Sequence, residues 1–383
     1  MTLPNDEIVI CQSTRRNLRY TLLWPNEKEE LKTGRNYVIT ITLFVLLSFV
    51  FPLSVLLHLV VTTIKNLDIP VTEDIDGVAS IGGMYYMAFM YIKNQAKIAL
   101  LLRDISDFKI FGKPPNFDEK NRRLNFISNV VFIYLICTPT QYSIIKYTQK
   151  NICEARNEKI GYEDNCGFIL PVWTPFSTKN VIVYWIYYIC ISVGAQILIK
   201  PSLLITFHAF EITQHLILKI EHLKQMLHDC FENKNDIICR KKLNKCISYH
   251  REIVRLATCL DYCFSNGMLT HITITIIVCA CIEKQFAEGD YIAAITHLST
   301  WVVTLVFACF SGQILIDASE SIISSLWFSK WYEADVQLQK DVLFMLLKSQ
   351  KIFYLTAGPF NYLSLPLLVS ALKMSYSILC ILI

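Results

Sequence analysis

The sequence predicts an all-α integral membrane protein with seven transmembrane helices, and three observations lead to that fold class. Hydrophobic residues make up 53% of the 383 residues and charged residues only 18%, which is more apolar than an ordinary soluble domain. The apolar residues gather in runs close to the about 20 residues that a helix needs to cross a bilayer. Lys and Arg are divided unequally between the connecting segments, which is typical of a protein oriented in a membrane.

Seven segments are predicted to span the membrane, since a helix satisfies its own backbone polar groups inside lipid. The first, residues 37–61, contains no Asp, Glu, Lys or Arg. The second, residues 77–92, gives the weakest signal, because it reaches span length only by extension into residues 93–102. The other five predicted spans are residues 126–145, 181–208, 264–282, 291–316 and 360–383.

The connecting segments set the predicted orientation, because Lys and Arg favour the cytoplasmic side. Over the alternating segments, 27 of the 36 Lys and Arg residues lie on the side of the N-terminus and seven on the other. We therefore expect a cytoplasmic N-terminus and an extracellular C-terminus, the inverse of a G-protein-coupled receptor. Residues 1–20 are too polar for the core of a cleavable signal peptide, so none is expected.

Three segments on the cytoplasmic side carry apolar residues at helical spacing, namely residues 208–231, 246–264 and 331–353. Such apolar faces must be covered. We favour an oligomerisation platform over the alternative of a self-contained base of the bundle. The predicted regions are an N-terminal cytoplasmic segment (1–36), spans 1 to 4 (37–210), a cytoplasmic helical extension (211–263), spans 5 and 6 (264–316), a cytoplasmic part of span 7 (317–358) and a separate terminal helix (359–383).

The seventh span is predicted to be split. Gly358 and Pro359 stand together just before the last apolar run. Glycine weakens a helix, and proline cannot continue one, because it lacks a backbone N–H and clashes with the preceding turn. We expect the cytoplasmic helix to end at this pair and a new helix to start near Phe360.

Cysteines are numerous, but only two of the 14 lie in a predicted extracellular loop. Cys153 and Cys166 are on the oxidising side of the membrane, so they can form a disulfide. The sequence leaves that pairing open, because a disulfide also depends on geometry. The other twelve are interpreted as small apolar side chains in the packing.

Enzyme, metal and nucleic-acid functions find no support in the sequence. No H-E-x-x-H, G-x-S-x-G, Walker A or G-x-G-x-x-G pattern occurs, so no catalytic residue and no cofactor is predicted. His208, His215 and His222 are seven residues apart, which separates them by about 10 Å along a helix, too far for one ion to bridge. No metal is therefore predicted, and basic residues are not interleaved with stacking aromatics as nucleic-acid binding would require.

The last 140 residues contain an ordered set of short motifs: CISYH at residues 246–250, WY at 331–332, KSQK at 348–351, AG at 357–358 and KMSYS at 373–377. This set resembles the insect odorant receptor family. The resemblance covers the whole chain in topology and about the last 140 residues in motif. A gustatory-type receptor, the sister family, would carry a Gln-Phe pair near the end, which is missing here.

This resemblance implies a ligand-gated, non-selective cation channel in the plasma membrane of olfactory sensory neurons. Family members assemble as tetramers with an obligate co-receptor, and the chain resembles an odour-specific subunit of such a heterotetramer. Its implied partners are that co-receptor, membrane lipid and a small volatile organic ligand. A secondary transporter is the alternative from another class, but it would show internal repeats, and none is found.

The resemblance also places a gate on the terminal helix, with residues 359–383 lining the pore. The family's gate positions fall on Leu379 and Ile383, which share a helix face with Tyr376. A ring of such apolar side chains can stop ions by dewetting. Lys373 is expected to lie off this face and to be paired within the protein, since a bare charge in a membrane is costly.

The odorant pocket is expected in the outer half of the bundle, as the family implies. A volatile, apolar ligand calls for aromatic and Met surfaces with one or two polar groups. The candidates, chosen by depth and helical phase, are Met84, Tyr85 and Ala88 on span 2, Thr138, Gln141 and Tyr142 on span 3, Trp185 and Tyr188 on span 4, and His297, Trp301 and Thr304 on span 6.

Overall fold

The computed structural model describes residues 8–24, 35–65, 72–161, 164–232, 236–287, 289–359 and 361–382, and these residues are almost entirely helical. Long helices account for all seven predicted spans. The elements are α1 (Gln12–Tyr20), α2 (Arg35–Ile64), α3 (Thr72–Ser106), α4 (Phe117–Thr148), α5 (Lys150–Ile160), α6 (Val181–Cys230), α7 (Asp236–Ala287), α8 (Tyr291–Trp327), the 3₁₀ turn η2 (Trp331–Glu333), α9 (Val336–Ser349), β1 (Thr356–Ala357), β2 (Asn361–Tyr362) and α10 (Leu365–Leu382).

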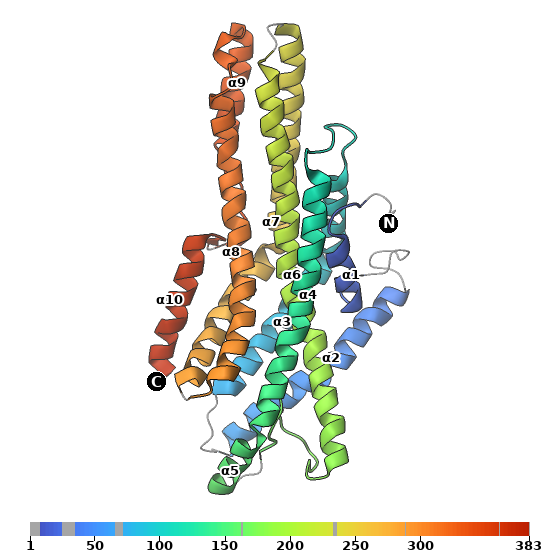
Figure 1. The fold of residues 1–383 in the computed structure, drawn as a ribbon, viewed down its shortest axis with the longest axis vertical. Helices are drawn as coiled ribbons and strands as arrows, with labels where there is room; N and C mark the ends of the chain where they lie inside the picture. Colours follow the sequence, from blue (N-terminus) through green and yellow to red (C-terminus); the bar gives the residue numbers. More distant parts are fainter. Residues whose placement is uncertain are drawn as a thin grey trace.

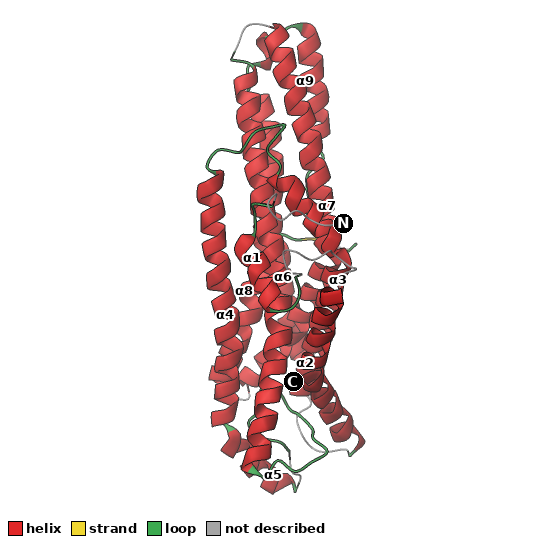
Figure 2. Ribbon diagram, turned by 90° about the vertical axis from the view of Figure 1, so that its right-hand side faces the viewer, coloured by secondary structure: helices red, strands yellow, loops and turns green. Residues whose placement is uncertain are grey.

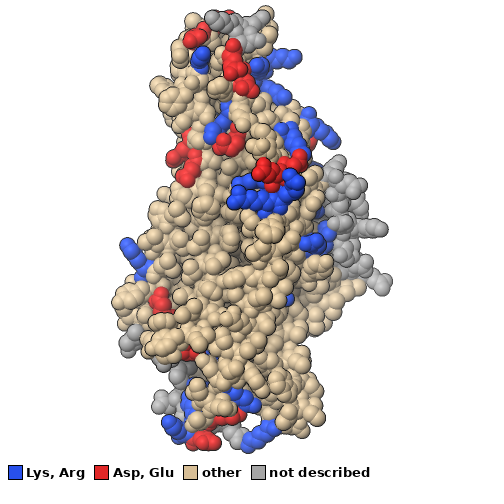
Figure 3. Space-filling view, in the orientation of Figure 1, with Lys and Arg blue, Asp and Glu red and all other residues tan. Residues whose placement is uncertain are grey.

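The helices form an elongated bundle, with α5 at one end and α9 at the other (Figures 1 and 2). We call the end with α5 the outer end and the end with α9 the inner end, following the orientation that the Lys and Arg distribution predicts. Charged side chains gather toward the inner end and again at the outer tip, and the surface between them carries few (Figure 3). This apolar band is the part of the surface suited to lipid.

Within the described residues, five helices are long and apolar enough to cross a membrane: α2, α4, α6, α7 and α8. The terminal helix α10 is apolar but shorter. The second predicted span lies within α3, which is long but less apolar, in keeping with its weak sequence signal. Together α2, α3, α4, α6, α7, α8 and α10 make up the seven-helix architecture.

Helix α6 lies at the centre of the bundle, in contact with α2, α3, α4, α7 and α8. Every residue from 201 to 216 is buried, so this stretch is enclosed on all sides. Nearer the outer end, the buried positions recur every three or four residues, for example Ile191, Ala195 and Leu198, which makes a single buried face. The same helix is thus a core element at one level and a wall at another.

Helices α6, α7, α8 and α9 extend beyond the rest of the bundle at the inner end (Figure 1). The predicted cytoplasmic helix at 331–353 is present in two pieces, the turn η2 and the helix α9. The side chain of Asp335 caps α9 by accepting a hydrogen bond from the backbone N–H of Gln337, at 3.1 Å. Large apolar side chains remain exposed here, including Phe344 and Leu347.

The chain reverses direction between α9 and α10 through a short antiparallel hairpin of β1 and β2. Gly358 lies at the turn with φ of +65°, where a Cβ would also come 2.6 Å from Leu269. Gly312 on α8 lets the hairpin approach, because a Cβ there would lie 2.2 Å from the carbonyl oxygen of Leu363. The last span is split as predicted, but the cytoplasmic helix α9 ends at Ser349, nine residues before the predicted end at Gly358. Helix α10 begins at Leu365, five residues after the expected start, and Phe360 lies outside the described residues.

Candidate functional site

A cavity lies between α2, α3, α4, α6 and α8 in the outer half of the bundle, and the loop before α6 closes it. Most of its lining is apolar, which suits a small apolar ligand. The lining side chains are Phe51, Ser80, Ile81, Met84, Thr138, Pro139, Tyr142, Ile169, Leu170, Ile199, Leu203, His297, Thr300 and Trp301.

The polar groups at this cavity form a chain that starts on α8. The indole N–H of Trp301 donates to Nε2 of His297 at 3.1 Å. Because an indole nitrogen only donates, Nε2 must be the unprotonated ring nitrogen and Nδ1 carries the proton. Nδ1 lies 3.7 Å from a carboxylate oxygen of Asp76, which is completely buried. His297 thereby orients the indole of Trp301 against the cavity, and Asp76 lies nearby without a hydrogen bond to His297.

Five of the predicted ligand-binding residues are brought together around this cavity. They come from α3 (Met84), α4 (Thr138 and Tyr142) and α8 (His297 and Trp301). The rings of Tyr142 and His297 lie 5.0 Å apart, so α4 and α8 meet directly across it. The structure thus places these five residues at one cavity, and their contact with a ligand stays a prediction.

Four other candidates lie inside the bundle but do not line the cavity. The hydroxyls of Tyr85 and Ser48 are hydrogen-bonded at 2.7 Å, and those of Tyr188 and Ser143 at 2.8 Å. Thr304 is 3.2 Å from a ring nitrogen of His271. These hydroxyls join neighbouring helices to each other. Ala88 is buried one turn of α3 away from Met84 and likewise does not reach the cavity.

Gln141 and Trp185 were placed on the wrong side of their helices. Gln141 is exposed on the outer surface of α4. The side chain of Trp185 is 42% exposed and packs on Tyr147, with ring centroids 5.3 Å apart. Aromatic and amphipathic side chains often occupy such boundary positions, since one edge can remain in a polar layer. Both residues are therefore corrected to surface positions.

Residues on α2, α6 and the outer loop complete the lining, and the sequence prediction missed them. Phe51 and Leu203 belong to helices that are apolar all round, so no hydrophobic face indicates which side points inward. Ile169 and Leu170 come from the loop. The prolines at 171 and 175 are the one feature of the sequence that could have indicated a rigid loop there.

An ion-paired cluster lies between the cavity and the outer end of the bundle. The ammonium of Lys146 on α4 lies 3.0 Å from a carboxylate oxygen of Glu73 and 3.0 Å from one of Asp290. Gln149 donates to the other oxygen of Asp290 at 2.7 Å. The start of α3, the end of α4 and the start of α8 are thereby joined at the mouth of the bundle.

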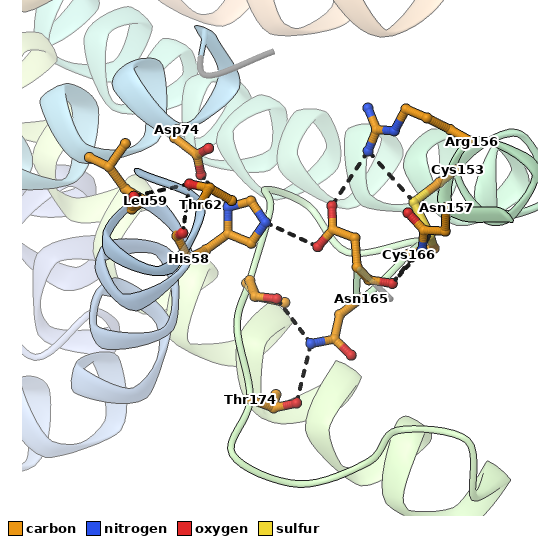
Figure 4. A network of polar contacts seen from close by, with 12 residues as sticks. His58, Leu59, Thr62, Asp74, Cys153, Arg156, Asn157, Asn165, Cys166 and Thr174 are labelled. Atoms are coloured by element: carbon orange, nitrogen blue, oxygen red, sulfur yellow. Dashed lines mark hydrogen bonds and ion pairs between the residues drawn. A yellow bond between two sulfur atoms is a disulfide. The ribbon is translucent and has the colours of Figure 1, made fainter. Parts of the chain in front are cut away.

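A second polar network fixes the outer loop (Figure 4). His58 on α2 lies 2.6 Å from a carboxylate oxygen of Asp74 and 3.0 Å from one of Asp164, and all three side chains are buried. Cys153 and Cys166 form a disulfide with their Cα atoms 5.6 Å apart, within the usual range. The loop that closes the cavity is thus attached to α2 and to α5.

The terminal helix α10 lies at the edge of the bundle, against α7 and α8 (Figure 1). Ser375 donates a hydrogen bond of 3.0 Å to the carboxylate of Glu283 on α7. The opposite face is open: Tyr376 is 63% exposed, whereas Leu379 is half-buried. Ile383, the other predicted gate residue, lies outside the described residues.

The position of Lys373 corrects the sequence prediction. Lys373 is exposed and lines one shallow groove together with Val369, Tyr376 and Ser377, so it shares the face of Tyr376. Its ammonium makes no hydrogen bond or ion pair with any residue that the structure describes. Residues 373 and 376 are three apart, and such neighbours lie on the same side of a helix.

Comparison with known proteins agrees with this architecture. The family model described as "7tm Odorant receptor" matches residues 77–376. Odorant receptor 67c of Drosophila melanogaster is 23% identical over 309 residues, which cover 76% of this chain and 74% of that protein. The odorant receptor coreceptor of Harpegnathos saltator is 24% identical over 144 residues, 36% of this chain and 30% of that protein.

Solved structures show the same fold over nearly the full length. The insect olfactory receptor OR5 from Machilis hrabei has a TM-score of 0.76 at 12% identity, covering 97% of this chain and 96% of that one. Its complex with eugenol gives a TM-score of 0.77 at 13% identity, covering 99% of both chains. These matches do not favour the gustatory-type and transporter alternatives, and they indicate a receptor or channel rather than an enzyme. The chain belongs to the odorant receptor family, as an odorant-binding receptor channel subunit with the seven-helix membrane fold.

Proposed function

We propose that the chain is an odour-specific subunit that binds a small volatile ligand in the outer cavity and thereby opens a pore lined by α10. It acts in the plasma membrane of olfactory sensory neurons, in a heterotetramer with a co-receptor. The observation that carries this proposal is the apolar cavity shared by five helices, with one oriented indole, that of Trp301, in its wall. Such a site suits a ligand that is bound mainly through apolar contact.

The route from the cavity to the pore helix runs through α7. Trp301 lies against His271 of α7, with the ring planes 24° apart and the centroids 6.1 Å apart. The same helix holds α10 through Glu283 and Ser375. A ligand that displaces Trp301 would therefore move the helix to which α10 is attached. It activates only if it binds the open arrangement more tightly than the closed one.

The exposed face of α10 is the proposed pore wall, with Leu379 and Ile383 as the gate. Helix α10 carries Lys373, Tyr376 and Ser377 on one side. A positive charge at Lys373 would oppose the passage of cations. Four such lysines in a homotetramer would oppose it more strongly than the smaller number present in a heterotetramer. This charge favours a heteromeric pore in which other subunits supply part of the wall.

The inner end supplies the proposed contact with the co-receptor. Phe344 and Leu347 on α9 are 58% and 61% exposed, and Ile237 at the start of α7 is 81% exposed. Apolar side chains gathered on the charged, water-facing end of a membrane protein mark an interaction surface. Assembly of subunits would cover them.

Paired tryptophan variants test the proposal, each co-expressed with the co-receptor. An odorant panel first identifies an agonist, and currents are then recorded against its concentration. Trp301→Ala should raise the half-maximal concentration on the order of tenfold, because it removes a large apolar contact. Trp185→Ala is the matched control outside the cavity, and it should change the half-maximal concentration less than about twofold.

The pore assignment is tested in the same cells. Leu379→Ala should alter ion permeation and leave the half-maximal odorant concentration nearly unchanged. If both tryptophan variants shift odorant sensitivity equally, or if Trp301→Ala changes the reversal potential, the separation of ligand site and pore is wrong. Surface labelling of every variant distinguishes these effects from poor delivery, and Trp301→Phe serves if the alanine variant does not reach the surface.

A further inference from the structure

Three potential metal ligands meet in the inner half of the bundle, far from the odorant cavity. Glu211 and His215 are one helical turn apart on α6, and Cys11 comes from the segment just before α1. One donor atom from each side chain lies within 4.8 Å of the other two. The relative exposures are 0% for Cys11, 0% for Glu211 and 1% for His215.

The hydrogen bonding of this cluster is incomplete. Both ring nitrogens of His215 lack a hydrogen-bond partner among the described residues, as does Oε1 of Glu211. The other carboxylate oxygen, Oε2, accepts a hydrogen bond from the hydroxyl of Thr14 at 2.5 Å. Buried polar atoms are nearly always hydrogen-bonded, because a buried polar atom that has lost water and gained no partner destabilises the fold. Because each residue turns one donor atom toward the cluster, the unpartnered imidazole of His215 and the unpartnered carboxylate oxygen of Glu211 together indicate a missing ligand.

We propose that Cys11, Glu211 and His215 bind a Zn²⁺ ion that fastens the N-terminal segment to α6. A thiolate, a carboxylate and an imidazole are all ligands that zinc accepts, whereas the hard cations Ca²⁺ and Mg²⁺ select oxygen alone. Cys11 binds after its thiol proton leaves to solvent. The thiolate and the carboxylate then balance the two charges of the ion.

The geometry needs only a small contraction. Zinc bonds of about 2.0–2.3 Å place tetrahedral ligands about 3.5 Å apart, so the donor atoms must approach by about 1 Å. Rotation of the Cys11 and Glu211 side chains supplies that movement without moving the helix. A water molecule can take the fourth position.

The surrounding hydroxyls already orient the carboxylate. Thr14 on α1 bonds to Glu211, and it is itself 2.6 Å from the hydroxyl of Ser128 on α4. Such outer contacts turn a metal ligand toward its ion and are part of most metal sites. These contacts leave Oε1 of Glu211 as the carboxylate oxygen that can bind the ion. Three elements, α1, α4 and α6, are thereby involved in one site.

The histidine series in the sequence does not bind the ion jointly. His208 is hydrogen-bonded through Nδ1 to the hydroxyl of Tyr91 at 2.9 Å, and His222 faces Tyr249. Only His215 is paired with a nearby acid and thiol. The thiol comes from a position about 200 residues earlier, which no local spacing pattern can reveal. The expectation of no metal rested on local spacing alone.

Metal analysis of the purified full-length chain tests this proposal without any odorant. Mass spectrometry of the detergent-solubilised protein, after incubation with equimolar zinc and gel filtration, should give about one zinc per chain. Cys11→Ser and His215→Gln should each weaken zinc binding on the order of tenfold or more. The matched controls are Cys230→Ser, another buried cysteine, and His208→Gln on the same helix.

Two further measurements test the site without counting bound zinc. Cobalt in place of zinc should give a thiolate-to-metal absorption band that Cys11→Ser abolishes. A chelator should lower the melting temperature of the wild-type chain and leave that of Cys11→Ser unchanged. Wild-type protein without zinc overturns the proposal, as does equal loss in the control variants. Zinc retained by the Cys11→Ser/His215→Gln double variant is an adventitious ion only and overturns it too.

Discussion

The outer and inner parts of α6 are one continuous helix in two different surroundings. The outer part buries a single face and leaves Trp185 and Ile186 exposed, while Ile199 reaches the cavity and Leu203 lines it where the two parts meet. The inner part, residues 201–216, is enclosed on every side. Enclosure restricts a helix through close packing, whereas a wall that faces a cavity can shift. The outer half of the molecule is therefore suited to sensing, and the inner half to holding the assembly together.

The largest expected effect comes from overfilling the inner half at Gly312. Gly312→Ala places a Cβ 2.2 Å from the carbonyl oxygen of Leu363, where the backbone must move. We expect a loss of stability of about 1–3 kcal/mol and a severalfold fall in surface level. Flow cytometry of labelled receptor gives the surface level. Gly82→Ala is the control, because no atom lies within 4 Å of its added Cβ. An unchanged surface level in Gly312→Ala would show that the backbone in the inner half can move to accommodate an added Cβ, against the rigidity argued for it.

Removal of the disulfide should have the next largest effect and should stay in the outer half. Cys153→Ser frees the loop that closes the cavity, and a closed loop of this length contributes about 3 kcal/mol in the chain-entropy description. We expect a lower melting temperature and a weaker response to odorant. Extracellular reductant should reproduce the weaker response in the wild type but not in Cys153→Ser. Equal sensitivity of both proteins to reductant would place the effect elsewhere.

A smaller effect is expected at the mouth of the cavity. Lys146→Gln removes the cation that lies between Glu73 and Asp290, so the two carboxylates are no longer bridged. Exposed ion pairs contribute about 0.2–1 kcal/mol. Lys146 is only 12% exposed, so its pairs should reach the upper end of that range, and we expect a change of about fivefold in the half-maximal odorant concentration. Dose–response currents measure it. Lys150→Gln should leave the concentration unchanged, because the ammonium of Lys150 contacts Glu154 and the ring of Tyr184, neither of which lines the cavity.

The smallest effect is expected from an exposed ion pair toward the inner end. Arg255 lies 2.7 Å from a carboxylate oxygen of Asp104 and 2.6 Å from one of Glu252, and its side chain is 53% exposed. Arg255→Ala should cost less than about 1 kcal/mol of stability, because solvent screens such pairs. Thermal unfolding measures this cost. A clear shift in odorant sensitivity would contradict the assignment of sensing to the outer half.

The sequence predicted the fold because each span carries its own signal. Apolar length located the long helices, and Gly358 located the break before α10. Met84 and Tyr142 lie on helices that are less apolar than α2, so fewer positions competed for the inward-facing side. Phe51 could not be placed in this way, because α2 is apolar all round and lipid and core favour the same side chains there.

Contacts between distant segments were the part that could not be predicted. Leu170 reaches the cavity from a loop, and Cys11 meets His215 across most of the chain. Such meetings depend on how whole helices pack, which no window of the sequence contains. The exposure of Lys373 was missed for a related reason: a costly charge was assumed to find a partner inside its own chain.

The absence of α7 from the described cavity lining has a consequence for how receptors of this kind diversify. Helix α7 carries the main attachment of α10, while the cavity proposed for the ligand is lined by α2, α3, α4, α6 and α8. Substitutions that reshape the cavity therefore need not disturb the conducting element. A duplicated gene can therefore acquire substitutions in the cavity that change odorant specificity. The helix proposed to line the pore need not change, because different helices form the cavity wall and attach α10.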